Sequence, residues 1–555
     1  MKFSKLTLAI AATLGASASF NAVALDLYVD TKTKQIFAEP GRGRTLLGEF
    51  EKVGTATAQP KAIVSAPAAD THAEIAAIKQ DLEAKTTEIK ALSEHAEAES
   101  APQSVHVKLD DGIHFATKDG NFTAGINGRM QVDSQSNLDQ NLVGQYGNYI
   151  SANGVPATLN DGATLRRARL GVEGTFFKNS FYKFEYDFTR GNGLNAGGIT
   201  DAYIGHTFSK PFSLKVGAFK EPFSLEEATS NRYTTFIERN MAVNAFVDNM
   251  NTYKVGIGAN FVQDRWLVAS SFQTEGVGGY SNAYGSNNKF DSATTGSAIG
   301  VNGGVNRNGG GGDTSWEVNT RVVGTPWMES KTKFLHVGAS GSYIAINNNY
   351  LNGGTFSNGG VIYSNGLASN VDRSGILSTG NLTNSKDLTH PAAHEVNNVI
   401  RFGAESAVVY GPFSAQSEYI QTNLSGTGYN STSLSGYYGY TTYFLTGESR
   451  NYKSKTGSWD RIKPNHNFDL KGGLGAWELA AGYDYLNLTA GQVNGGRASL
   501  GKFGVNWYLN SHVRVMANYV KALDINTSGA AAGTQAKAWN RGDLDMIETR
   551  VQLDW

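Results

Sequence analysis

Cationic and hydroxyl side chains gather in one irregular stretch, "KVGAFKEPFSLEEATSNRYTTFIERNMAVNAF". Lys220, Ser224 and Arg232 could bind an oxyanion, because Lys and Arg supply positive charge and a hydroxyl donates a hydrogen bond. The same stretch contains acidic residues, among them Glu221 and Glu226. It therefore also fits an extracellular loop whose charges pair locally, and both interpretations are open.

Further arginines lie in segments where apolar and polar residues alternate. In "NFTAGINGRMQVD" Arg129 belongs to the polar set, and "LRRARLGVEG" contains Arg166, Arg167 and Arg169. Alternation with a period of two predicts a strand with two different faces. Arg167 and Arg169 share the polar face of their strand. Acidic residues such as Glu185 occupy polar faces as well, so we expect a basic stripe opposite an acidic wall.

The strands that position these residues recur from Gly120 to the C-terminus. We count about sixteen segments of the length that crosses a membrane as a strand. Gly- and Asn-rich stretches at 276–313 and 347–393 alternate with tight joins at Lys210-Pro211 and Asn510-Ser511. Short turns that alternate with long loops are typical of an outer-membrane barrel.

The last strand, "IETRVQLDW", places Ile547, Val551 and Trp555 on one face. A soluble sandwich would bury this face, whereas a membrane barrel turns it toward lipid. The number of strands and the 25 Tyr and 27 Phe favour the barrel over a soluble β-rich adhesin. We predict an all-β fold, a transmembrane antiparallel β-barrel of about 16 strands over residues 120–555, with an aqueous channel. Loop 3, at about 220–250, is expected to fold into that channel.

The N-terminal part predicts export. Residues 1–24 have a basic start, a short apolar stretch and the small residues Ala22-Val23-Ala24, as in a signal peptide. The protein is therefore expected in the bacterial outer membrane, in contact with its lipid, with the N-terminal segment in the periplasm. Residues 25–69 are predicted to form a small hairpin and linker, and residues 101–119 a connector.

Residues 70–100 have a different period. Apolar positions recur at steps of three and four, which is a heptad pattern; they are Ile75, Ile78, Leu82, Ile89, Leu92 and Ala96, with Lys85 as the polar exception. The segment predicts a short coiled-coil helix that associates with copies of itself or with a periplasmic partner. A lone amphipathic helix is the alternative.

Composition excludes several functions. The chain has no cysteine, which excludes disulfides and thiol chemistry. Its formal net charge of −1 predicts no nucleic-acid partner. The histidines are scattered, no catalytic set can be assembled, and Pro391 disfavours a helical metal pair in "HPAAHE". We therefore expect a passive channel without a cofactor or metal, and no enzyme.

Several motifs resemble the phosphate-selective porin O and P family: "RRARLGVEGTFFKNSFYKFEYDF", "GITDAYIGHTF", "VGAFKEPFSLEEATSNRYTTFIERN" and "NWYLNSHVRVMANYV". The resemblance runs from about Gly120 to Trp555. It implies a homotrimer that conducts small anions, phosphate or related oxyanions, through a pore lined by Arg and Lys. The implied constriction consists of Lys220, Ser224, Arg232, Arg129, Arg166 and Arg167. A general or organic-solute porin with weak selectivity, and a structural envelope tether, are the alternatives.

Overall fold

The computed structural model describes residues 25–30, 36–37, 44–50, 79–90, 105–109, 112–142, 157–189, 198–248, 253–276, 291–292, 296–297, 316–346, 350–352, 355–357, 361–369, 371–372, 374–380, 382, 394–530 and 534–555. The predicted signal peptide, residues 1–24, lies outside these ranges. The chain divides into two compact units, Met1–Glu97 and Ala98–Trp555.

The first unit contains a small antiparallel sheet and one described helix. Strands β1 (Leu25–Asp30), β2 (Ile36–Phe37) and β3 (Arg44–Phe50) pair in the order β2-β1-β3. The predicted hairpin is thus present as β1 and β2, and β3 adds a third strand. A helix covers residues 79–90, inside the predicted coiled-coil segment. No described helix has the length and apolar character needed to cross a membrane.

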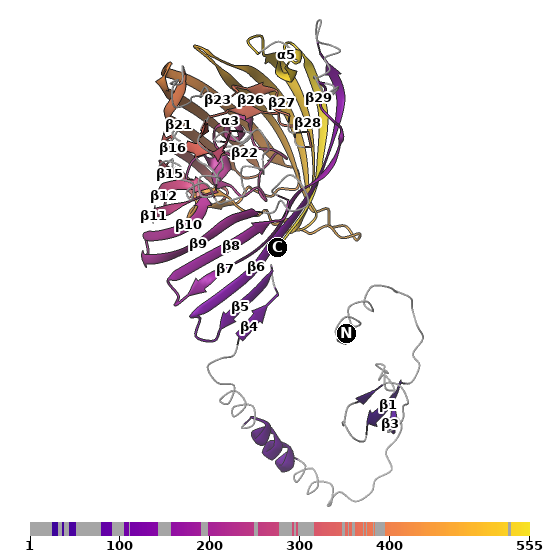
Figure 1. The fold of residues 1–555 in the computed structure, drawn as a ribbon. Coiled ribbons are helices and arrows are strands. Elements are labelled where there is room, and N and C mark those ends of the chain that lie inside the picture. The colour runs from indigo at the N-terminus through magenta and orange to yellow at the C-terminus, as the bar shows by residue number, and fades with distance from the viewer. Residues whose placement is uncertain are drawn as a thin grey trace, which may run out of the picture. The chain divides into compact units, whose positions relative to one another are not determined.

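The second unit is a closed barrel, and sixteen strands form its ring in the described part of the chain (Figure 1). They are β6 (Phe122–Asn141), β7 (Gly162–Phe176), β8 (Ser180–Asp187), β9 (Gly198–Ser209), β10 (Phe212–Lys220), β11 (Tyr253–Val262), β12 (Trp266–Gly276), β15 (Trp316–Ser330), β16 (Lys333–Ala345), β21 (Glu395–Tyr410), β22 (Phe413–Thr427), β23 (Tyr429–Phe444), β26 (Ala476–Ala490), β27 (Val493–Tyr508), β28 (Val513–Asn526) and β29 (Asp543–Asp554). Each strand is antiparallel to its neighbours, so the predicted fold is confirmed.

Shorter elements accompany the ring. The hairpin of β4 (Val105–Lys108) and β5 (Ile113–Thr117) pairs with β6 and lies within the predicted connector. Four further two-stranded sheets and three short helices complete the described elements: β13 (Asp291–Ser292), β14 (Gly296–Ser297), β17 (Tyr350–Asn352), β18 (Thr355–Ser357), β19 (Ser364–Asn365), β20 (Leu377–Ser378), β24 (Tyr452–Lys453), β25 (Ser458–Trp459), α2 (Leu225–Ala228), α3 (Met241–Phe246) and α5 (Gln535–Ala538).

The last residue closes the ring. Strand β29 pairs with β6, and the backbones of Trp555 and Gly128 exchange two hydrogen bonds of 3.1 Å. The Trp555 ring occupies the space in front of Gly128, where a Cβ atom would lie 2.3 Å from it. Glycine at this position therefore lets the terminal indole lie flat against the closing strand.

Alternation along β29 matches the two environments of a membrane barrel. Val551 is 54% exposed on the outer face, whereas Glu548 and Arg550 are 1% exposed on the inner face. Because closing the sheet pairs every strand with two neighbours, the outer face can contact lipid without unpaired backbone groups. The same sorting holds on β8, where Phe184 is exposed and Glu185 is buried.

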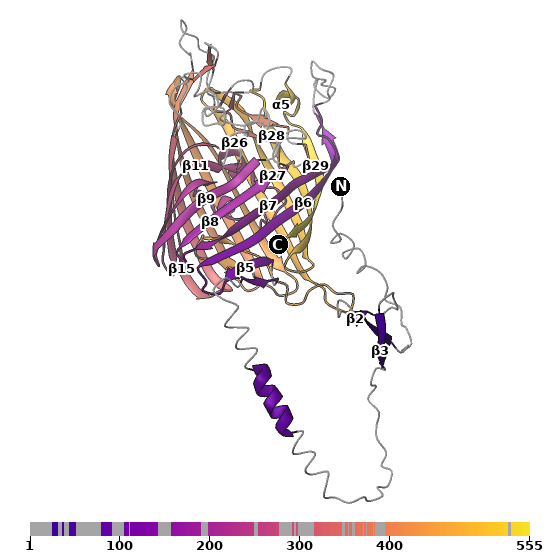
Figure 2. The ribbon, with the colours of Figure 1, turned by 60° about the horizontal axis from the view of Figure 1, so that its bottom comes forward.

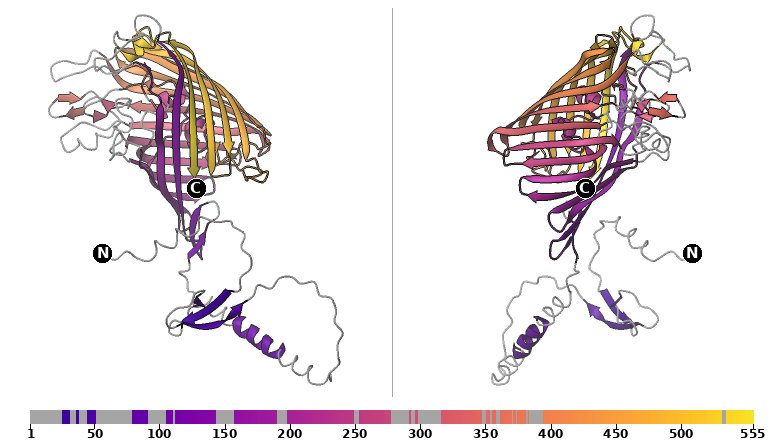
Figure 3. Two further views of the ribbon diagram at one scale, coloured as in Figure 1. Left: turned by 90° about the vertical axis from the view of Figure 1, so that its right-hand side faces the viewer. Right: turned by 60° about the vertical axis from the view of Figure 1, so that its left-hand side comes forward.

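The two ends of the barrel differ as predicted. Strands connect through short joins at 210–211, 331–332 and 411–412 at one end, which we call the turn end. The other end, the loop end, has most of the long connections, including 221–252 and 346–394. Figure 2 shows α5 at the loop end, opposite the C-terminus, and Figure 3 shows β4 and β5 (purple) at the C-terminal, turn end. The join 445–475 is an exception, because it is long and lies at the turn end.

The prediction that polar residues line the whole lumen is wrong for one half of the barrel. Inner positions of β22 to β29 near the loop end are apolar, and loop segments cover them. We call this cluster the apolar plug; its members include Leu424, Leu434, Leu486, Leu500, Val520, Met546, Met241, Phe246, Tyr363, Leu377 and Trp539. Helix α3 is enclosed by the ring and contacts β22, β23 and β26 (Figure 1). The loops exclude water there, so these inner positions need no polar side chains.

Residues 446–461, the inner turn, enter the lumen from the turn end, whereas most of the remaining connection, up to residue 474, is exposed. Trp459 is 3% exposed and packs with Leu225 of α2, Phe334 of β16 and Val409 of β21. Its backbone N–H donates to Thr229 Oγ1 at 3.2 Å. The Arg450 guanidinium lies 3.9 Å from the centre of the Trp459 indole. The inner turn thus supports the loop that follows β10.

Replacing Trp459 with alanine should release the inner turn. Removing a buried tryptophan costs about 3–5 kcal/mol of packing free energy, and here that packing joins two segments inside the lumen. We expect a higher and noisier single-channel conductance, measured in planar bilayers. Trp266→Ala is the control, because Trp266 is 44% exposed on the outer face. Equal conductance traces for the two variants would show that Trp459 does not hold the turn.

Candidate functional site

The segment after β10, residues 221–248, folds into the lumen, and we call it the inner loop. Its first carboxylate, Glu221, accepts hydrogen bonds from Arg401 of β21 at 2.8 and 3.0 Å and from Lys254 of β11 at 3.0 Å. Lys254 also binds Glu317 of β15 at 2.6 Å. All four side chains are fully buried. This cluster, the loop anchor, fixes the start of the inner loop to the barrel wall.

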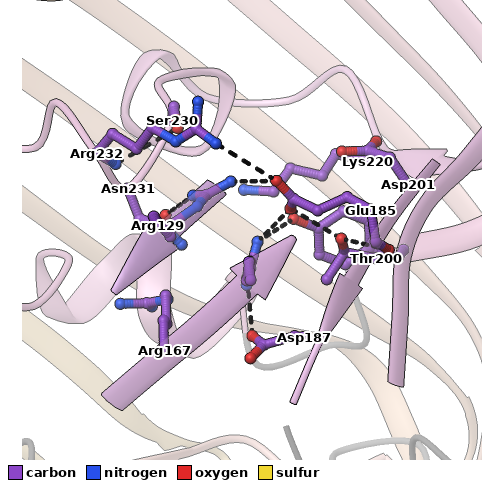
Figure 4. Close-up of polar contacts among 12 residues, drawn as sticks. Arg129, Arg167, Glu185, Asp187, Thr200, Asp201, Lys220, Ser230, Asn231 and Arg232 are labelled. Atoms are coloured by element: carbon purple, nitrogen blue, oxygen red, sulfur yellow. Dashed lines mark hydrogen bonds and ion pairs between the residues drawn. The ribbon is translucent and has the colours of Figure 1, made fainter. Parts of the chain in front are cut away.

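Apolar side chains attach the rest of the inner loop to the same side. Met241, Val243 and Phe246 of α3 belong to the apolar plug. The polar residues Asn231 and Arg232 face the opposite wall, where β6 to β9 lie (Figure 4). The inner loop therefore contacts β22–β26 through the apolar side chains of α3 and faces β6–β9 with Asn231 and Arg232.

Guanidinium groups cover the wall that faces this polar side. We call Arg129, Arg166, Arg167, Arg169 and Arg550 the arginine wall. Glu185 of β8 lies among them: its Oε2 accepts from Arg129 at 2.6 Å and its Oε1 from Arg169 at 2.9 Å. Arg232 of the inner loop lies 3.8 Å from the same carboxylate (Figure 4).

A bulge brings two consecutive arginines into the lumen. The register between β6 and β7 shifts between Gln131 and Val132, next to Arg166 and Arg167 on β7. An extra residue in one strand turns side chains away from strict alternation. Arg166 donates to Glu238 of the inner loop at 2.9 and 3.3 Å. Sequence alternation had placed only Arg167 of this pair on the inner face.

Arg167 differs from the other arginines of the wall. Its Nη1 donates to the amide oxygen of Gln131 at 3.0 Å, and its side chain is 5% exposed. It forms no ion pair with a carboxylate in the described ranges of the chain. Figure 4 shows it beside the paired arginines, apart from Glu185 and Asp187. Arg167 is therefore a buried cation that makes no direct ion pair in the described part of the chain.

The family of the chain follows from comparison with known proteins. The family model described as phosphate-selective porin O and P matches residues 137–555. The chain belongs to this family. Porin O of Pseudomonas aeruginosa is 29% identical over 430 residues, which cover 75% of this chain and 86% of that protein. An uncharacterized protein of Caulobacter vibrioides is 27% identical over 461 residues, covering 82% of this chain and 79% of that one.

The solved structures to which this chain is similar include an outer membrane protein and an anion-selective porin. The trimer form of OmpT from Vibrio cholerae has 11% identity and a TM-score of 0.43, covering 78% of this chain and 99% of that one. An anion-selective porin from Comamonas acidovorans has 11% identity and a TM-score of 0.42, covering 78% and 100%. Family membership makes this chain an outer-membrane porin. Its turn end is therefore periplasmic and its loop end extracellular.

The structure brings four of the six predicted site residues of this porin together. Arg129, Arg167 and Arg232 lie where the inner loop faces the arginine wall (Figure 4). Arg166 contacts the inner loop there through Glu238. Lys220, at the end of β10, forms an ion pair with Glu227 and lies 5.6 Å from the Tyr253 ring centre. The local charge pairing of the alternative interpretation is therefore present at Lys220, and the role of Lys220 in anion binding stays a prediction.

Ser224 has a structural partner. Its Oγ accepts from the Glu227 N–H at 3.2 Å and caps α2. The backbone N–H groups of Leu225 and Glu226 donate to Glu418 of β22 at 3.1 and 2.8 Å. A wall carboxylate therefore already occupies the N-terminus of α2. The role of Ser224 in anion binding remains a prediction.

Two carboxyl groups of the inner loop differ in charge at neutral pH. Burial raises the pKa of Glu226 to about 7. Burial also raises the pKa of Glu238, but the guanidinium groups of Arg166 and Arg167 outweigh that effect and lower it to about 2. Glu238 is therefore ionised beside the arginine wall, whereas Glu226 is only partly ionised on the side of the apolar plug.

Sequence reasoning missed some residues of the site. Arg550 binds Asp133 through two hydrogen bonds of 2.6 Å and donates to the Ile237 carbonyl oxygen at 2.8 Å. The position of Arg550 on the polar face of the last strand could have predicted that its side chain lies in the lumen. Trp459 and Arg450 were also missed, although the non-alternating stretch 445–475 marked an unusual connection.

Proposed function

We propose that this porin lets small anions, phosphate or related oxyanions among them, diffuse passively through a channel lined by arginine and lysine and narrowed by the inner loop. Hydrogen bonds from Arg166 to Glu238 and from Arg550 to the Ile237 carbonyl oxygen join the inner loop to the arginine wall. The path runs beside this contact, where Lys220 and Arg232 keep 23% and 13% of their side chains exposed. The apolar plug fills the opposite side and offers no ligands to an ion. The arginine wall places five guanidinium groups on the side that faces Asn231 and Arg232 of the inner loop.

The observation that carries this proposal is the environment of Arg167. A buried cation without a carboxylate partner is unfavourable unless an anion or water compensates it. Its only described hydrogen bond goes to Gln131, a neutral group. A mobile anion passing the wall supplies the missing charge.

Ion pairs next to Arg167 weaken its attraction for a passing anion. A binding site in a pore must attract the ion and also release it. Glu185 and Glu238 neutralise much of the charge around Arg167, because they pair with Arg129, Arg169 and Arg166. The same pairing favours a broad anion channel as the second candidate, one that admits small organic acids as well as phosphate.

Reversal potentials in a KCl gradient test the proposal on the purified porin. We expect a chloride-selective potential, and inorganic phosphate should block the chloride current. Cation selectivity would reject the proposal. Anion selectivity without phosphate block would reject the oxyanion preference and support the broad anion channel. Absence of steady pores would favour a structural envelope tether.

We also propose that the porin is a homotrimer. β8 has 8 residues, fewer than the about 9–11 that a tilted strand needs to cross a bilayer, and β10 has 9, at the lower end of that range. Neighbouring copies can cover this low part of the wall, where Tyr182, Phe184 and Tyr186 alternate along β8. The long strands, such as β6 with 20 residues, then face lipid.

Replacing Lys220 with glutamate should lower the preference for anions and weaken the phosphate block. The substitution removes a cation and places two carboxyl groups together, because Glu227 is the ion-pair partner of Lys220. Selectivity should move toward cations, measured as a shift in reversal potential. An unchanged potential and block would remove Lys220 from the ion path.

A further inference from the structure

The helix at 79–90 has exposed apolar residues on one face. Every residue of this helix is exposed. Leu82 and Ile89 are 65% and 67% exposed and lie two turns apart on one face. Lys85 lies between them on the same face. Such an isolated helix is too short to be stable in water by itself, so its apolar face requires a partner.

Heptad spacing defines the positions around the stripe. With Leu82 and Ile89 at a and Lys85 at d, the g positions are Glu74, Asp81 and Glu88, and the e positions are Lys79, Thr86 and Ser93. The g column is acidic throughout, and the e column is basic or neutral. These flanking charges select the orientation of the partner helix.

An antiparallel copy would bring acidic g positions against each other. A parallel copy instead brings each g position against the e position five residues later in the other chain. Within the described helix, Asp81 then faces Thr86, whereas the antiparallel arrangement would set Asp81 against Glu88. The charges therefore fit a second copy of this chain in parallel orientation and disfavour the antiparallel arrangement.

We propose that the helix at 79–90 forms a parallel coiled coil with the same helix of neighbouring copies in the periplasm. Copies of one porin in one membrane carry their N-terminal segments on the same side and in the same direction, so the parallel arrangement is available to them. Lys85 at a seam position sets the register at a cost in stability. A three-stranded coil depends on the homotrimer proposed above. Parallel association of two or more copies does not depend on it.

Cysteine substitution tests this on the full-length porin in outer membranes, because the chain has no cysteine of its own. Leu82→Cys places a thiol in the seam, and Thr87→Cys places one on the opposite face of the same helix. After mild oxidation, Leu82→Cys should give covalent dimers at a yield about tenfold above Thr87→Cys, measured on non-reducing gels. Both substitutions lie in the first compact unit and leave the sequence of the barrel unchanged, so both variants should fold.

Equal crosslinking at the two positions would overturn the proposal, because it would show proximity without a defined seam. Absence of crosslinking at Leu82 would overturn it as well, in favour of a different partner or a lone helix. Deleting residues 70–100 separates the coil from the channel: conductance and anion selectivity should persist without it. A coil detected in a porin that proves cation-selective would leave this inference standing and reject only the proposed function.

Discussion

Replacing Glu221 with glutamine should detach the start of the inner loop and destabilise the barrel by about 3 kcal/mol or more, since removing one partner leaves buried charges uncompensated. Arg401 would lose the carboxylate that accepts its bonds of 2.8 and 3.0 Å. Lys254 would keep Glu317 at 2.6 Å. Most of the lost stability therefore comes from the charge of Arg401, which is fully buried and would have no carboxylate partner.

Two measurements follow the effect of Glu221→Gln. Heating in detergent should convert the folded barrel to its unfolded mobility on gels at a lower temperature than for the unchanged protein. Single-channel conductance should rise and become noisier, because the anchor holds the loop that narrows the channel. Both changes should occur together, since both come from the same contact.

Glu329→Gln is the matched control. Glu329 pairs with Lys333 at 3.1 Å, but their side chains are 59% and 35% exposed, and such a pair contributes only about 0–1 kcal/mol. It should leave unfolding and conductance unchanged. If Glu221→Gln behaves like this control, the apolar contacts of α3 alone hold the inner loop in place.

The loop anchor also shows what the sequence could not predict. Glu221 stands next to Lys220, which suggested a local pair, but its partners Lys254 and Arg401 are 33 and 180 residues away along the chain. Spacing in the sequence contains no information about such distant pairs. Alternation along β11 and β21 is enough to place Lys254 and Arg401 on inner faces, yet their partners depend on how the loop folds.

The barrel itself was predictable, because lipid and water impose a period of two on every strand. Ile547 and Glu548 show this directly, since they are 39% and 1% exposed. The apolar plug was not predictable from that rule, which assumes water on the inner side. Leu486 and Leu500 are fully buried on inner faces because loops from the extracellular end cover them.

The role of Ser224 as a helix cap could have been predicted from the residues next to it in the sequence. Ser224 and Glu227 have the spacing of a helix capping box, and the structure shows the Ser224 hydroxyl capping α2. At Arg166 no such signal existed, because the bulge that turns it inward arises from pairing between β6 and β7. Local chemistry predicts caps, whereas register shifts depend on the neighbouring strand.

Replacing Arg167 with glutamate should have the largest effect on selectivity. The substitution changes the charge by two units at the part of the wall that lacks a carboxylate partner. One unit charge at about 4 Å contributes roughly 1 kcal/mol even in water. A change of about 2 kcal/mol alters the anion-to-cation permeability ratio by more than about tenfold.

Arg497→Glu makes the same change of charge outside the channel and is the control. Arg497 lies 3.9 Å from Asp524, and its side chain is 49% exposed. Long-range effects of net charge should be equal in the two variants, and salt screens them beyond about 10 Å at 0.1 M. Reversal potentials should therefore move toward cation selectivity only for Arg167→Glu. Equal potentials in both variants would place the ion path away from the arginine wall, because a charge beside the path acts on every ion that passes it.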